Sequence, residues 1–171
     1  MGPEAGEPRR AISVSGRGRW AWHVATIADI RIFVHATFLI LVVWFAVIAW
    51  TEVHSLAPTA LMVALFLLLF GCVLLHEMGH ALTARHFGFP TREITLLPIG
   101  GIASLERMPE DPRQSLLITL AGPAVNVAIA VALVALLRLV GWWRPLAEIS
   151  LTNGPFLERL ALVNLSLVAF N

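Results

Sequence analysis

Long apolar runs alternate with short polar segments along this chain. Residues 32–50 contain one histidine among apolar side chains, residues 59–84 are apolar up to a polar group near their end, and residues 116–137 form a third long apolar stretch. A helix needs about 20 apolar residues to cross the hydrocarbon core of a bilayer. The pattern therefore predicts three complete transmembrane helices.

A fourth apolar segment, from Leu160 to Asn171, is too short to cross a bilayer. We expect a partial fourth span, and hence a chain that is a fragment, because a terminus at that depth would leave a carboxylate in hydrocarbon. The predicted fold is an all-α polytopic membrane protein. Its domains are a mobile cytoplasmic tail at residues 1–30 and a transmembrane core at residues 31–171 that is incomplete at its C-terminus.

The segment between the second and third spans has a different pattern. Residues 93–108 contain two short strand-like runs that are separated by Pro98 and the Gly100-Gly101 pair. This pattern predicts a short membrane-associated β-hairpin. Its free edge could take up an extended peptide as an added strand, or the segment could be only an apolar loop at the membrane surface. The sequence leaves both interpretations open.

Composition supports a membrane protein. Apolar residues make up 58% of the chain, charged residues 13%, and the mean hydropathy is +0.80, which exceeds the apolar content of ordinary soluble domains. The only cysteine, Cys72, lies within the second span and cannot form an intramolecular disulfide. We expect it to be a small packing residue.

Charge predicts the orientation in the membrane. All twelve basic residues are arginines, and nine of them lie before the first span or between the second and third. Basic residues collect on the cytoplasmic side, so the N-terminus is predicted to be cytoplasmic. This rule also accounts for the arginines of the tail, which contains Glu4 and Glu7 and no nucleic-acid-binding motif. We expect no nucleic-acid partner.

Near the inner end of the second span the sequence reads His76-Glu77-Met78-Gly79-His80. On a helix, His76 and His80 are four residues apart and share a face, so both imidazoles can bind one metal ion. A catalytic zinc site needs a third protein ligand and an open position for water, which Glu77 would help to activate. A charged side chain at mid-bilayer costs about 2.5–3.5 kcal/mol, so packing alone is a poor explanation for this group.

Other polar residues of the spans have less specific interpretations. His35, near the start of the first span, could join a cavity at the motif, but an interfacial role is favoured. His86 is off the face of the motif and is expected at the interface. In the third span, Asn126 is expected to face the motif helix and to form an ordinary interhelical hydrogen bond.

Five segments together resemble the site-2 protease family of intramembrane zinc metalloproteases: VHATF, HEMGH, TLLPIGG, AGPAVN and NLSLVAFN. The resemblance covers about residues 30–171. It implies that His76 and His80 bind one zinc ion and that Glu77 is the general base. It also implies that Asn171 stabilises the oxyanion, and that an aspartate after Asn171 is the third ligand. The 171-residue chain alone is therefore expected to be inactive.

The resemblance further implies hydrolysis of peptide bonds within or near transmembrane segments, in the membrane of a prokaryotic cell. The expected partners are the lipid bilayer and a transmembrane substrate, such as an anti-sigma factor or a membrane-tethered regulator. Two alternatives remain at this point: a membrane metalloprotease of the prenyl-protein-processing type, and a non-catalytic membrane scaffold or metal-handling protein. A CBS or PDZ domain could follow the core.

Overall fold

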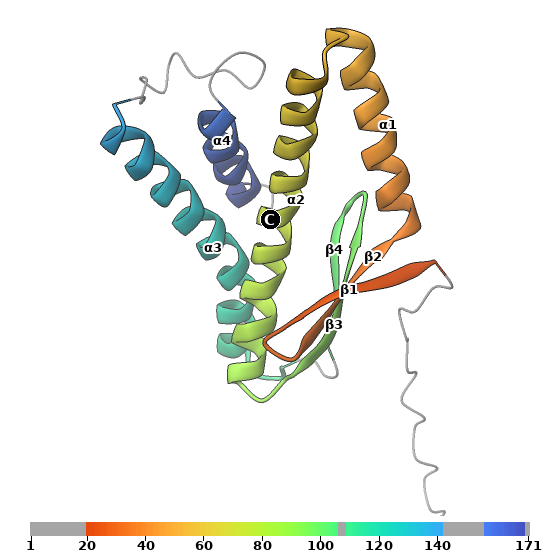
Figure 1. The fold of residues 1–171 in the computed structure, drawn as a ribbon. Coiled ribbons are helices and arrows are strands. Elements are labelled where there is room, and N and C mark those ends of the chain that lie inside the picture. The colour runs from red at the N-terminus through yellow and green to blue at the C-terminus, as the bar shows by residue number, and fades with distance from the viewer. Residues whose placement is uncertain (1–19, 106–108, 142–155, 170–171) are drawn as a thin grey trace, which may run out of the picture.

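The computed structural model describes residues 20–105, 109–141 and 156–169, which form a helical bundle with a small sheet at one side (Figure 1). The elements follow one another along the chain as β1 (Ala21–Ile27), β2 (Ile30–His35), α1 (Ala36–Val53), α2 (Leu56–His86), β3 (Thr91–Leu97), β4 (Gly100–Leu105), α3 (Pro112–Leu139) and α4 (Phe156–Ala169).

Three of these helices are long and apolar enough to cross a membrane. They are α1, α2 and α3, with 18, 31 and 28 residues, and this confirms the prediction of three membrane-spanning helices. The first begins at Ala36 rather than at residue 32, because residues 30–35 belong to strand β2. Most of the large apolar side chains of α1 are exposed, as suits a helix in contact with lipid.

The fourth helix, α4, packs against both α3 and α2. Figure 1 shows α4 beside α3 and next to the half of α2 that precedes the motif. Its described part has 14 residues. Asn171, which sequence analysis assigned to this segment, lies outside the described residues.

The sheet corrects two predictions. It has four strands in the order β1-β2-β3-β4, with β2 and β3 parallel and the other two pairs antiparallel. The fold is therefore mostly helical with a sheet, and not all-α with a single hairpin. Residues 21–27, assigned to a mobile tail at residues 1–30, form β1. Residues 1–19 of that tail lie outside the described part.

Long-range pairing explains why these strands form. A two-stranded hairpin is only marginally stable alone, and β2 obtains its second neighbour from β3, about 60 residues further along the chain. Across this pair the Arg31 guanidinium contacts the buried Glu93 carboxylate at 3.4 Å.

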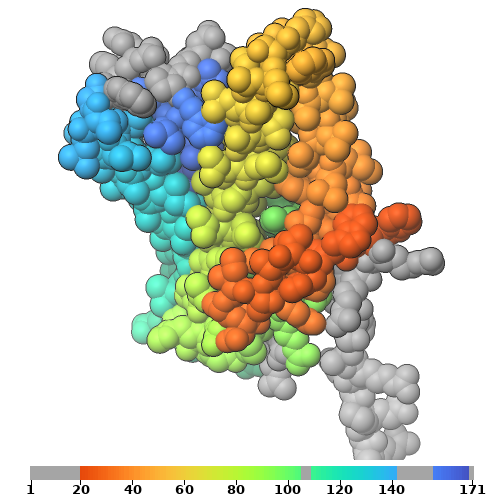
Figure 2. All heavy atoms as spheres, in the orientation of Figure 1, coloured from red at the N-terminus to blue at the C-terminus, as the bar shows by residue number. Residues whose placement is uncertain are grey.

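The sheet packs against the motif helix through a small apolar core. Ile30 of β2 and Ile94 of β3 are fully buried against Met78 and Ala81 of α2. At the far end of the first hairpin, Arg85 of α2 donates a hydrogen bond of 2.7 Å to the carbonyl oxygen of Ala28. In Figure 2, β1 forms the outer surface of the sheet on the face shown. The sheet is thereby fixed beside the half of α2 that carries the motif.

Candidate functional site

The two histidines of the motif face the same point between α2 and α3. Their Nε2 atoms are 3.1 Å apart, and His76 is 8% exposed. Two nitrogens bound to one zinc ion at about 2.0–2.1 Å, at a tetrahedral angle, would be separated by about 3.3 Å. The spacing of these two atoms therefore fits a shared metal ion.

Two glycines create the room for this arrangement. A Cβ atom on Gly79 of α2 would lie 2.8 Å from the carbonyl oxygen of Ala121, so this glycine lets α3 come close to α2. A Cβ atom on Gly122 of α3 would overlap with His80 Nε2 and would lie 2.7 Å from His76 Nε2. The space in front of both ring nitrogens exists because residue 122 has no side chain.

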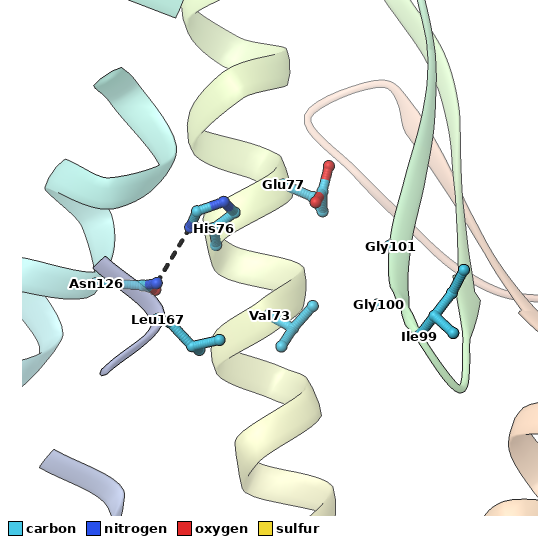
Figure 3. Close-up of a pocket in the computed structure, with 8 residues that line it drawn as sticks. All are labelled: Val73, His76, Glu77, Ile99, Gly100, Gly101, Asn126 and Leu167. Carbon is cyan, nitrogen blue, oxygen red and sulfur yellow. Dashed lines mark hydrogen bonds between the residues drawn. The ribbon is translucent and has the colours of Figure 1, made fainter. Parts of the chain in front are cut away.

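The other ring nitrogens are held by groups of α3. His80 Nδ1 is 2.6 Å from the carbonyl oxygen of Ile118, and His76 Nδ1 is 3.1 Å from the side-chain amide nitrogen of Asn126 (Figure 3). A carbonyl oxygen only accepts hydrogen bonds, so the neutral imidazole of His80 carries its single ring proton on Nδ1. Its Nε2 then presents a lone pair, which is the form that binds a metal ion.

Glu77 extends from α2 toward the sheet and away from α3 (Figure 3). Strand β4 passes so close that a Cβ atom on Gly101 would lie 2.5 Å from Glu77 Cγ. The hairpin turn at Pro98 and Ile99 places Gly100 at a φ of 133°, where glycine is favoured. Strand β4 thus restricts the Glu77 side chain at the side of His76.

A cavity of about 180 Å³ joins these groups. It receives side chains from α2, α3 and α4 and from the β3–β4 hairpin (Figure 3). Its lining residues are Val73, His76, Glu77, Ile99, Gly100, Gly101, Asn126 and Leu167. The part of the cavity that is lined by His76, Glu77 and Asn126 is polar, and a nucleophilic water could be activated there. The neighbouring wall is apolar and could accommodate a peptide side chain.

The structure shows the contacts of the other polar residues that the sequence analysis considered. His35 caps α1, since its Nδ1 accepts a hydrogen bond of 3.3 Å from the Thr37 backbone amide. His86 is exposed and contacts the Phe87 ring. Cys72 is buried, as expected for a packing residue. Asn126 faces the motif helix, as expected.

Within the described ranges, no cluster of three or more His, Cys, Asp or Glu side chains could hold a metal ion. Sequence reasoning also missed the contributions of Gly101 and Ile118 and the space that Gly122 leaves in front of the two histidines. The glycines stood in the quoted TLLPIGG and AGPAVN segments, but their contacts with the motif depend on tertiary packing.

The fold and the site define a membrane protein with an H-E-x-x-H site between packed helices. The model of "Peptidase family M50" matches residues 64–171. The chain belongs to this family, which includes the site-2 protease. Its structure is similar to "Site-2 Protease from Methanocaldococcus jannaschii", with a TM-score of 0.62 and 31% identity, over 88% of this chain and 63% of that one.

Curated relatives agree with this assignment. "Zinc metalloprotease MJ0392" of Methanocaldococcus jannaschii is 33% identical over 145 residues, which are 85% of this chain and 39% of the relative. "Putative zinc metalloprotease sll0528" of Synechocystis is 37% identical over 61% of this chain and 26% of its own length. "Stage IV sporulation protein FB" of Bacillus subtilis is 32% identical over 58% and 31%. The chain thus spans between about a quarter and two fifths of these relatives.

Proposed function

We propose that the complete protein is an intramembrane zinc metalloprotease that hydrolyses peptide bonds within or near transmembrane segments of its substrates. One observation carries the proposal: the Nε2 atoms of His76 and His80 lie 3.1 Å apart. Glu77 lines the same cavity as His76. Membership of peptidase family M50 and the position of the motif on a candidate membrane span support it.

His76 and His80 would hold the zinc ion through Nε2. The room at Gly122 and the hydrogen bond from His80 Nδ1 to Ile118 fit this role. A catalytic zinc site needs a third protein ligand, and the family resemblance assigns it to an aspartate after Asn171. Asn171 itself is proposed to stabilise the oxyanion. When bound, zinc supplies a Lewis acid at this position.

Glu77 is the proposed general base. Its carboxylate would accept a proton from the water molecule that attacks the scissile carbonyl carbon, and would then donate this proton to the leaving amine nitrogen as the C–N bond breaks. Gly101 lies against the Glu77 side chain and so limits the directions in which the carboxylate can point. Fixing the base in this way favours proton transfer because less reorientation is needed.

The proposed substrate is a membrane-spanning protein, such as an anti-sigma factor or another membrane-tethered regulator. Carbonyl groups in a helix are hydrogen-bonded to their own chain, so the substrate must unwind locally. β4 is at the edge of the described sheet and borders the cavity through Gly100 and Gly101, which supports pairing with an extended substrate segment. N-methylation of single peptide groups along a substrate tests this. Only alternate residues of a strand direct their N–H groups to a given neighbour, so pairing predicts that methylation reduces cleavage at every second position.

The proposed location is the cell membrane of a prokaryote, with a cytoplasmic N-terminus and the β3–β4 hairpin in contact with the membrane. The distribution of arginines supports this orientation. Reporter fusions at the N-terminus and in the loop between α1 and α2 would test it. A reporter that is active only outside the cytoplasm should function in the loop and not at the N-terminus.

The test of the protease function is Glu77→Gln in the complete protein. We expect cleavage of a transmembrane substrate in proteoliposomes to fall by about 10²–10⁴-fold, because the base is lost while both histidines remain. Zinc content should stay at one ion per protein. Glu52→Gln is the matched control, since Glu52 is an exposed residue near the end of α1. Undiminished cleavage by the Glu77 variant would refute the mechanism.

The same experiment addresses the two alternatives. The match to peptidase family M50 favours the site-2 protease type over the prenyl-protein-processing type. A complete protein that binds no zinc and cleaves no transmembrane substrate would instead support a membrane scaffold, and one that binds zinc without cleavage would support metal handling.

A further inference from the structure

Asn126 lies directly behind His76, on the side away from Glu77 (Figure 3). Its side chain is fully buried, and its amide nitrogen is 3.1 Å from His76 Nδ1. Its amide oxygen has no hydrogen-bond partner among the described residues. A buried carbonyl oxygen without a partner is unfavourable and rare in native proteins, so its position calls for an explanation.

The direction of the hydrogen bond at His76 determines which ring nitrogen can bind a metal ion. In a neutral imidazole one nitrogen donates and the other accepts. If the Asn126 amide nitrogen donated to Nδ1, then Nε2 of His76 would carry the proton, donate it to His80 Nε2 at 3.1 Å and have no lone pair for a metal. If the Asn126 oxygen accepted from Nδ1, then Nε2 would be free to bind. His80 is in this second state, because its Nδ1 faces a carbonyl oxygen.

We propose that Asn126 is a positioning residue that holds His76 in the tautomer with the proton on Nδ1. A half-turn of the amide exchanges its oxygen and nitrogen, which occupy nearly the same space. The oxygen then accepts the proton of Nδ1, so the buried oxygen gains a partner and both Nε2 atoms present lone pairs to the space in front of Gly122. The inference rests on the proposed zinc site, and it assigns to Asn126 more than the packing role of an interhelical hydrogen bond.

The first test is zinc affinity of the complete protein, measured in detergent by competition with a chelator. Asn126→Leu retains a similar volume and removes the acceptor, and we expect its affinity to fall by about 10–100-fold. Asn126→Asp keeps an acceptor and should stay within about threefold of the wild type. Asn164→Leu is the matched control, because Asn164 is equally buried and its amide oxygen also has no partner among the described residues, but its amide nitrogen donates to Leu160 of its own helix and not to a motif histidine; its affinity should not change. A folded Asn126→Leu protein with wild-type affinity would overturn the proposal.

A second measurement needs no variant to fold. Nitrogen-15 NMR of the histidine-labelled, zinc-bound complete protein distinguishes metal-bound from protonated ring nitrogens. We expect His76 to bind zinc through Nε2 and to carry its proton on Nδ1, and zinc bound through Nδ1 with the proton on Nε2 would overturn the proposal. This result is independent of cleavage: a protein without protease activity but with the Nδ1 tautomer would refute the proposed function and leave the role of Asn126 intact.

Discussion

Gly122 of α3 lies directly against the ring of His80 on α2, so close that a Cβ atom at residue 122 would overlap with His80 Nε2 and lie 2.5 Å from Cε1. The glycine therefore does more than allow two helices to approach. It preserves the space in which the nitrogens of His76 and His80 converge, and this relationship leads to the first prediction.

Gly122→Ala should reduce the zinc affinity of the complete protein by about 10–100-fold. The new methyl group would occupy the metal position or displace one of the two histidines. Gly71→Ala is the matched control. Gly71 is also in a long helix, but a Cβ atom there would meet nothing within 4 Å, and alanine favours helix by up to about 1 kcal/mol. Isothermal titration with zinc compares the two, and equal affinities would contradict this role of Gly122.

Gly101→Ala should reduce turnover by about 100-fold and leave zinc affinity near the wild-type value. The added methyl group would push against Glu77 Cγ, and a displacement of about 1 Å of a catalytic group costs about this much. Ile102→Ala, one residue further along β4, changes an exposed side chain and serves as the control. Steady-state cleavage is measured together with zinc content, and loss of zinc from the Gly101 variant would show that β4 acts on the whole site instead.

His80→Ala should abolish both zinc binding and cleavage, because a single remaining histidine cannot hold the metal ion firmly. His86→Ala removes a histidine from the same helix that is exposed and should leave both properties unchanged. Metal analysis after purification gives the first quantity. Chelation should inactivate the His86 variant reversibly, with activity returning after addition of zinc. Activity that resisted chelation would exclude a role for the metal.

The ion pair between β2 and β3 and the pair between the β1–β2 turn and α2 should differ in their effect on stability. Glu93→Gln removes a charge whose side chain is 8% exposed and which contacts Arg31 across β2 and β3, so we expect a loss of about 1–3 kcal/mol in the free energy of unfolding. Asp29→Asn affects a pair with Arg85 in which the Asp29 side chain is 89% exposed, and should cost less than about 1 kcal/mol. Unfolding in a denaturing detergent measures both, and equal losses would show that burial does not decide the contribution.

Local features of the sequence were sufficient to predict the helical core of the site. The three candidate spans depend on the length of apolar runs, and the shared face of His76 and His80 depends only on helical geometry. Both are properties of neighbouring residues, so no tertiary information was needed. The strands within residues 93–105 were likewise visible because Pro98 and the two glycines separate two short apolar runs.

Only the tertiary structure showed that residues 21–27 and 30–35 are strands, since β2 has β3 as a neighbour and the pairing joins segments about 60 residues apart. It also decided which residues surround the motif. Gly101 and Gly122 reach Glu77 and the two histidines from other elements, and single-sequence patterns do not encode such distances. Asn126 was expected to face the motif helix, but only the structure showed that His76 is its partner. The sequence by itself determined the chemical groups and the helix that carries them. Tertiary packing decided the space in front of the histidines and the partners that orient them.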